Sequence, residues 1–173
     1  MSTKRIPIYS NTLMRPADLV SFSVIGLYLL PWYRYVQSHA LSDLIPFVGM
    51  IVTVALNETL KHLVIGDASP RPPRARDCNL WVNDGPQGGR PGAPSGHSAQ
   101  VAFFAMYALM DPWWSPLSRG ALVVYALAVM ASRAWKQCHT LGQIVSGGIL
   151  GTVLAAAAAA TASTASPRVL SRT

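Results

Sequence analysis

Residues 94–97, Pro-Ser-Gly-His, combine the residue types that could bind a phosphate group and transfer it. They stand directly before an uncharged run, residues 98–110, that predicts a membrane helix. The backbone N–H groups at the start of such a helix are unpaired and favour an anion, and His97 adds an imidazole in the first turn. Taken alone, however, the tetrapeptide is better explained as a Pro-Ser helix cap with an incidental histidine.

Basic residues and a second histidine accompany this tetrapeptide along the chain. Lys61 and Arg71 precede it, and Arg133 and His139 follow it, with Gln143 one helical turn further on. Cleavage of a phosphate ester or anhydride needs cations that neutralise charge, a nucleophile, and an acid for the leaving group. Two arginine forks, a lysine and two histidines could supply all three. The set therefore predicts a site that handles phosphate.

Three motifs in order carry a resemblance to a known family. They are Lys61 followed later by Arg71-Pro72, then residues 94–97, then Ser132-Arg133 with five residues before His139. This pattern resembles the type-2 phosphatidic acid phosphatase superfamily, also called lipid phosphate phosphatases. The resemblance implies that His139 attacks phosphorus to form a phosphohistidine, that His97 protonates the leaving oxygen, and that water then releases phosphate without a metal or other cofactor. The residues it implies are His139, His97 and Gln143 for catalysis, and Lys61, Arg71, Ser95, Gly96 and Arg133 for phosphate binding.

Two departures from the family pattern qualify this resemblance. Nine residues separate Lys61 from Arg71, more than in the family pattern, so that Arg74 or Arg90 could take the place of Arg71. Gln143 stands where most of the superfamily has Asp, and an amide can orient the histidine ring but brings no charge. From the sequence alone we expect Gln143→Asp to retain or raise activity.

The amino-acid sequence around Gln143 resembles that of one branch of the superfamily, the dolichyl diphosphatases, which carry Gln at this position. Residues 139–148 and 92–100 both resemble that branch, except that Gly96 stands where the branch usually has Ser. The resemblance covers residues 57–151, about half of the chain. It implies a polyprenyl diphosphate as the substrate.

Composition predicts a membrane protein independently of the motifs. Hydrophobic residues make up 51% of the 173 residues and charged residues only 12%, too few to cover a water-soluble globule. The net charge of +7 could suggest nucleic acid, but the basic residues form no stripe and no nucleic-acid motif is present. They fall between apolar runs, as in membrane loops and anion sites.

The apolar runs predict an all-α integral membrane bundle of about five transmembrane helices. We expect one domain over residues 17–166, between a basic lead (1–16) and a basic tail (167–173). The expected spans are residues 19–33, 44–65, 98–110, 120–131 and 141–162. Residues 66–93 form a loop too polar and too rich in proline to cross a bilayer, and residues 132–140 form a polar connection. In the last span, small residues suit close helix contact: Ser146, Gly147, Gly148 and Gly151.

Five spans bring all the motif-bearing segments to one membrane face. The loop after the second span, the start of the third, and the connection between the fourth and fifth must share that face. A different count would separate Lys61 and Arg71 from His97 and His139. The active site is therefore expected at one membrane surface.

Several residues near the motifs have simpler explanations. Glu58 and Lys61 are three residues apart, so a snorkelling Lys61 could form an ion pair with Glu58. The motif match nevertheless favours contact of Lys61 with the ligand. Cys78 and Cys138 fall in loops on the same face, and they could pair if that face is lumenal or external; two unlinked thiols are expected. His39 and His62 are expected at helix ends or in loops, not as ligands.

The sequence thus predicts a multi-pass membrane lipid phosphatase, in the endoplasmic reticulum or another cellular membrane, whose partners are a lipid phosphate or diphosphate substrate and membrane lipids, without nucleic acid. Alternatives are a phosphatase acting on phosphatidate or another lipid monophosphate, a pseudoenzyme that binds lipid phosphate without turnover, and a structural membrane protein or transporter with a fortuitous match. The positive-inside rule does not orient the chain, because basic residues lie on both faces.

Overall fold

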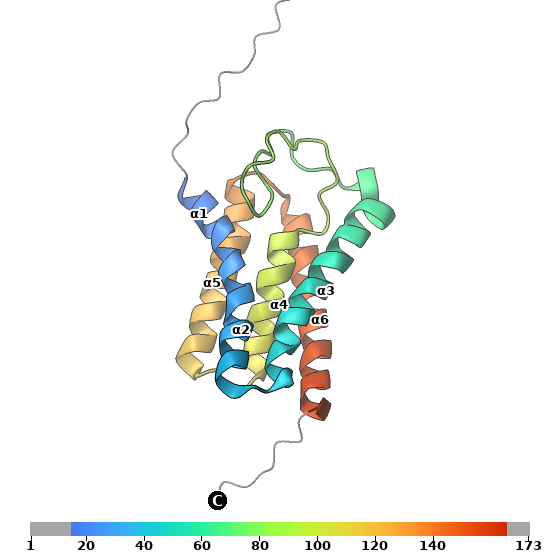
Figure 1. Cartoon of the computed structure of the whole chain (residues 1–173). Coiled ribbons are helices and arrows are strands. Elements are labelled where there is room, and N and C mark those ends of the chain that lie inside the picture. Colours follow the sequence, from blue (N-terminus) through green and yellow to red (C-terminus); the bar gives the residue numbers. More distant parts are fainter. Residues whose placement is uncertain (1–14, 166–173) are drawn as a thin grey trace, which may run out of the picture.

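The computed structural model describes residues 15–165 and shows a bundle of long helices with one long loop at one end (Figure 1). Within these residues the regular secondary structure is helical. The lead and tail predicted from the sequence lie outside the described residues, except that the first helix already begins at Pro16.

The first long rod joins α1 (Pro16–Phe22), η1 (Ser23–Ile25) and α2 (Gly26–Ser38). It is longer at both ends than the predicted span. Pro16 stands in the first turn, where its fixed φ suits a helix start. His39 ends the rod with a left-handed φ of 54°.

The second rod runs through η2 (Leu41–Leu44), α3 (Ile45–Thr59), a π-helical segment η3 (Leu60–Ile65) and η4 (Gly66–Ala68). The π-helical segment carries Lys61. Widened turns of this kind are frequent at functional sites. The end of this rod, which includes η3, lies at the end of the bundle where the long loop begins (Figure 1).

The remaining helices are α4 (Gly96–Met110), α5 (Pro116–Trp135) and α6 (Leu141–Ala165). The prediction of a polar connection over residues 132–140 was wrong in its first part, because α5 continues to Trp135 and Arg133 lies in its last helical turn. Alanine, serine and arginine here are compatible with a helix, and the chain leaves it only near Gln137, whose φ is 54°. Ser115 caps the start of α5 by accepting from the N–H of Ser118 at 3.2 Å.

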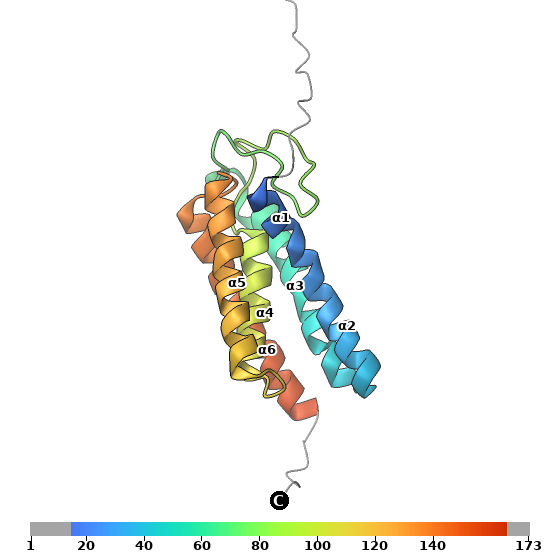
Figure 2. The same ribbon diagram turned by 90° about the vertical axis from the view of Figure 1, so that its left-hand side faces the viewer.

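Helix α4 lies at the centre of the bundle, where α3, α5 and α6 all pack against it (Figure 2). The glycines of α6 allow this close approach. A Cβ at Gly147 would overlap the carbonyl oxygen of Ser95, and a Cβ at Gly151 would overlap that of Ala99. The expectation that small residues in the last span serve helix contact is confirmed at these two positions.

Within residues 15–165, four helices are long and apolar enough to cross a membrane: residues 16–38, 41–68, 116–135 and 141–163. Helix α4 has 15 residues and is shorter than a full span, yet it runs beside the other four through the bundle (Figures 1 and 2). The predicted all-α membrane bundle with about five helices is confirmed.

A buried charge network closes the end of the bundle opposite the long loop. Arg34 of α2 forms ion pairs with Asp43, at 2.6 Å, and with Asp111, and its guanidinium lies 4.6 Å from the ring centroid of Trp113. These contacts join the end of α2 to the start of the second rod and to the end of α4. Buried charges of this kind require such partners.

Candidate active site

A cavity of about 630 Å³ lies at the loop end of the bundle. Its wall includes five of the eight residues proposed from the sequence: Lys61, Arg71, Gly96, His97 and His139. They come from the end of the second rod, the long loop, the start of α4 and the turn before α6. The segments that the motifs predicted to share one membrane face therefore meet around one cavity.

The two histidines line this cavity from different elements. His97 stands in the first turn of α4, is 5% exposed, and its Nε2 has no hydrogen-bond partner within the described part of the chain. His139 follows α5, and its Nδ1 lies 3.3 Å from Oε1 of Gln143. If Nδ1–H donates to this oxygen, Nε2 of His139 carries a lone pair.

The surroundings of His139 favour the neutral imidazole. Burial, followed by the positive charges of Arg71, Arg133 and Lys61, lowers the pKa of His139 to about 3, although the bond to Gln143 acts in the opposite direction. A neutral imidazole with a free lone pair can act as a nucleophile. The arrangement thus keeps His139 unprotonated near neutral pH.

Gln143 lies behind His139 and is almost fully buried. Its Oε1 also accepts from the N–H of Thr140 at 3.1 Å, and its Nε2 donates to the carbonyl oxygens of Ser69 and Pro70 at 3.1 and 2.9 Å. The amide oxygen of Gln143 therefore contacts the histidine, and the amide nitrogen binds the loop. An aspartate could not donate to these carbonyls.

Lys61 and Arg71 are the two cationic side chains in the cavity wall. The ammonium group of Lys61 contacts the carboxylate of Glu58, so the pair suggested by their spacing is present. Arg71 donates through Nε to the carbonyl oxygen of Pro91 at 3.3 Å, and its buried Nη1 has no partner within residues 15–165. Arg71 thus keeps a free donor for an anion.

The alternatives to Arg71 lie elsewhere. Arg74 and Arg90 are exposed and do not belong to the cavity wall. The carbonyl oxygen of Arg90 accepts from the N–H of Arg71 at 2.8 Å, so this residue helps to hold the backbone of Arg71 in place. The geometry favours Arg71 over Arg74 and Arg90 as the phosphate-binding arginine of the first motif.

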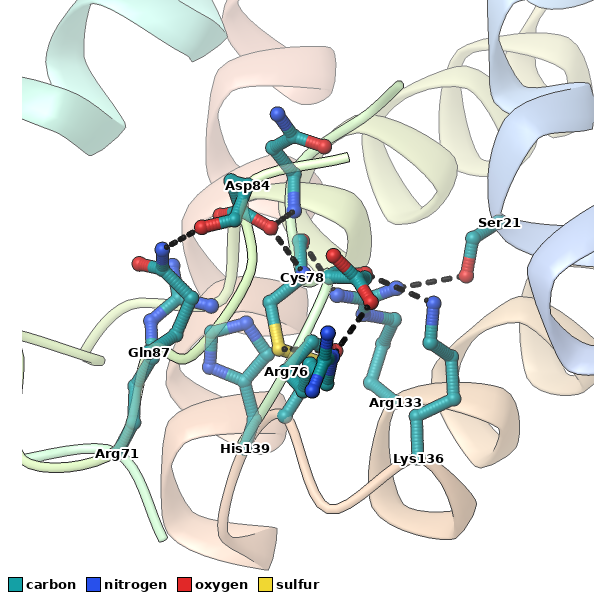
Figure 3. The surroundings of a disulfide bond; sticks show 12 residues. Ser21, Arg71, Arg76, Cys78, Asp84, Gln87, Arg133, Lys136 and His139 are labelled. Atoms are coloured by element: carbon teal, nitrogen blue, oxygen red, sulfur yellow. Dashed lines mark hydrogen bonds and ion pairs between the residues drawn. A yellow bond between two sulfur atoms is a disulfide. The ribbon is translucent and has the colours of Figure 1, made fainter. Parts of the chain in front are cut away.

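Arg133 is fully buried, and its guanidinium binds protein groups, whereas the sequence predicted that it would bind phosphate. Its Nη1 donates to Oγ of Ser21 and its Nη2 to the carbonyl oxygen of Cys78, both at 2.6 Å (Figure 3). The residue does not belong to the cavity wall. In this state Arg133 joins α1, α5 and the long loop, and its charge acts on the site from behind.

Ser95 and Gly96 form the start of α4. The N–H of Ser95 donates to the carbonyl oxygen of Gln143 at 2.9 Å, and its Oγ accepts from Ser98 at 3.0 Å. Ser95 is buried and does not line the cavity, whereas Gly96 does. Of these two residues, only Gly96 is therefore positioned to contact an anion bound in the cavity.

The expectation of two unlinked thiols was wrong, because Cys78 and Cys138 form a disulfide (Figure 3). It ties the long loop to the residue directly before His139. The two cysteines are 60 residues apart in sequence, and only the path of the loop across the end of the bundle brings them together. Their shared face was the one sequence signal that favoured pairing.

Asp84 and Gln100 are polar residues of the cavity wall that were not singled out from the sequence. Asp84 accepts through Oδ1 from the N–H of Cys78 at 2.6 Å and that of Asn79 at 3.3 Å, which orders the loop above the cavity (Figure 3). Gln100 lies in α4 below His97. An Asp-Gly dipeptide at residues 84–85 is a turn signal that could have marked Asp84.

Comparison with known proteins gives one match. The family model described as PAP2 superfamily matches residues 42–166 and therefore covers all eight residues proposed from the motifs. No curated protein and no solved structure matches the chain.

Proposed function

The chain belongs to the PAP2 superfamily, whose members are phosphatases, and on this premise we propose that it hydrolyses a polyprenyl (dolichyl-type) diphosphate to the monophosphate and phosphate. It is an integral membrane protein with its candidate site at one end of the bundle. The observation that carries the proposal is the pairing of two buried histidines, His97 and His139, with Lys61 and Arg71 around one cavity.

In the proposed reaction, Nε2 of His139 attacks the terminal phosphorus. A P–N bond forms, the bond from phosphorus to the bridging oxygen breaks, and His97, which is protonated when the anionic substrate is bound, gives its proton to that oxygen. His97 then takes a proton from water, whose oxygen attacks the phosphohistidine, so that phosphate leaves and both histidines return to their starting states. Gln143 orients His139 throughout.

The cations of the wall have separate roles in this proposal. Arg71 can donate to the phosphate oxygens through its unpaired Nη1, and Lys61 adds a point charge next to Glu58. Gly96 would offer a backbone N–H at the start of α4. Arg133, bound to Ser21 and Cys78, would stabilise the developing charge from behind the site unless substrate displaces these bonds.

The cavity wall also supports a lipid substrate. Apart from its charged groups it contains apolar side chains of α3 and the loop, namely Ile51, Val54, Ala55 and Leu80. A lipid phosphate has a charged group at one end and an apolar chain at the other, so it would match a wall that contains both charged and apolar side chains. The diphosphate rests on the resemblance of residues 92–100 and 139–148 to the dolichyl diphosphatase branch.

The disulfide supports an assignment of the site to an oxidising compartment. Cys78 and Cys138 both lie at the loop end of the bundle, and disulfides persist in lumenal, periplasmic or extracellular space. We therefore place the active face on the lumenal or external side of an endoplasmic reticulum or other cellular membrane.

Phosphate release by detergent-purified protein, without added metal, on polyprenyl diphosphate and phosphatidate in parallel tests the proposal. Release from the diphosphate that His139→Ala abolishes would support it. Preference for phosphatidate would retain the histidine mechanism and replace the substrate. A folded protein that binds lipid phosphate and releases none would be a pseudoenzyme, whereas release that does not depend on His97, Arg133 and His139 would make the motif match fortuitous.

A further inference from the structure

Gln100 is a buried amide in the cavity wall for which the reaction above has no use. It lies three residues after His97 on α4, and both residues line the same cavity. Residues three apart share a helix face, and the rise of about 1.5 Å per residue puts Gln100 about 4.5 Å deeper into the bundle. Its side chain is 8% exposed.

A tyrosine from another helix fixes the orientation of this amide. The hydroxyl of Tyr28 in α2 donates to Oε1 of Gln100 at 2.7 Å. The acceptor end of the amide is therefore occupied, and the Nε2 donors have no partner within the described ranges 15–163. Two N–H donors thus remain for a group inside the cavity.

The surroundings of Gln100 define which group could reach it. His97, one turn nearer to the loop end, is the proposed acid for the leaving oxygen. The same cavity wall includes Ile51, Val54 and Ala55 of α3, which offer no donor from their side chains. Gln100 is therefore a polar position between the reacting phosphate and the apolar wall.

We propose that Gln100 is a specificity-determining residue that donates from Nε2 to the phosphate remaining on the lipid, with Tyr28 as its positioning residue. The inference rests on the proposed function. The atom beyond the leaving oxygen is phosphorus in a diphosphate, with charged oxygens that can accept, but carbon in a monophosphate ester. A neutral amide binds this phosphate without the strong attraction of a cation, so the monophosphate product can leave.

The test compares polyprenyl diphosphate with polyprenyl monophosphate of the same chain length. The measured quantity is the ratio of their kcat/KM values, which cancels any general loss of active protein. Gln100→Met should lower this ratio about tenfold to a hundredfold, the range for a hydrogen bond to a charged group. Gln100→Glu keeps an acceptor for Tyr28 but replaces the donors by a negative charge, and it should lower the ratio further.

Tyrosine variants separate positioning from packing. Tyr28→Phe should lower the ratio by a smaller factor, about threefold, because the amide loses its fixed orientation. Tyr125→Phe is the matched control: its hydroxyl also bonds across helices, to Ser23 at 2.8 Å, but outside the cavity wall, and the ratio should not change.

Inhibition provides a second measurement that needs turnover of the diphosphate only. Gln100→Met should raise the inhibition constant of inorganic diphosphate about tenfold relative to that of inorganic phosphate. An active wild type whose Gln100 variants leave both the kcat/KM ratio and this inhibition ratio unchanged would overturn the inference alone. A wild type inactive on the diphosphate would overturn the proposed function and the inference with it.

Discussion

Gln143 joins His139 to the loop that covers the cavity. Its Oε1 lies 3.3 Å from Nδ1 of His139, while its Nε2 donates to the carbonyl oxygens of Ser69 and Pro70. One side chain therefore fixes both the orientation of the His139 ring, the proposed nucleophile, and the position of the loop that carries Arg71. This double role distinguishes the glutamine from an aspartate, which could serve the histidine only.

Gln143→Asp should therefore reduce activity, contrary to the expectation from the sequence alone. The shorter carboxylate cannot donate to Ser69 or Pro70, and buried acceptors without donors cost about 1–3 kcal/mol of stability. Displacement of the ring should lower kcat at least about tenfold. Steady-state kinetics and thermal unfolding measure both effects. Gln137→Asp, at an exposed glutamine in the preceding turn, is the control, and a Gln143→Asp protein as active as wild type would contradict the prediction.

Gly92→Ala should disturb the same contact from the loop side. A Cβ at Gly92 would lie 2.6 Å from Nε2 and 2.7 Å from Oε1 of Gln143, so the amide must move. We expect a loss of kcat comparable to that of Gln143→Asp, about tenfold or more. Gly142→Ala is the matched control, because a Cβ there meets nothing within 4 Å and alanine stabilises a helix by about 1 kcal/mol. Equal activity of the two variants would refute the predicted crowding.

The buried imidazole of His139 should make stability depend on pH. Its pKa is about 3 in the folded protein and 6.5 in the unfolded chain, so the unfolded state binds more protons between these values. Stability from this group is fully present above pH 6.5 and is lost as pH falls toward 3. His139→Asn removes this contribution. Thermal unfolding from pH 7 to 4 should therefore show a steeper fall of Tm for wild type than for the variant, and parallel curves would argue against a buried neutral histidine.

The disulfide should stabilise both the protein and its site. Closure of a 60-residue separation constrains the unfolded chain by about 4 kcal/mol, and loss of the bond would loosen Cys78, whose carbonyl oxygen accepts from Arg133. Reductant should lower the Tm and the turnover of wild type. The double variant Cys78→Ser with Cys138→Ser should start from these lower values and not respond to reductant. A wild-type enzyme with unchanged Tm after complete reduction would contradict this role.

The sequence was sufficient for the parts of the site that depend on helix count and order. Lys61, His97 and His139 each stand at the end or start of an apolar run, so the alternation of spans determines that they meet at one face. The glycines of α6 likewise show their packing role through spacing alone. These features are local patterns that long-range folding does not alter.

The remaining features depend on the path of the long loop, which no periodic pattern encodes. Asp77 and Val82 adopt left-handed φ values of 49° and 57°, so local preference alone would not predict this path. The disulfide, the engagement of Arg133 with Cys78, and the bonds from Gln143 to Ser69 all follow from it. The motifs identified these residues without revealing what they contact.

The most direct test of the proposed mechanism is rapid-quench trapping of the phosphorylated enzyme. Wild-type protein is mixed with polyprenyl diphosphate labelled at the terminal phosphorus, and label bound to protein is followed during the first turnovers. The mechanism predicts a transient, acid-labile phosphoryl group on His139 that forms before phosphate release and is absent from His139→Ala. Phosphate release by wild type without any labelled protein, or equal labelling of His139→Ala, would contradict it.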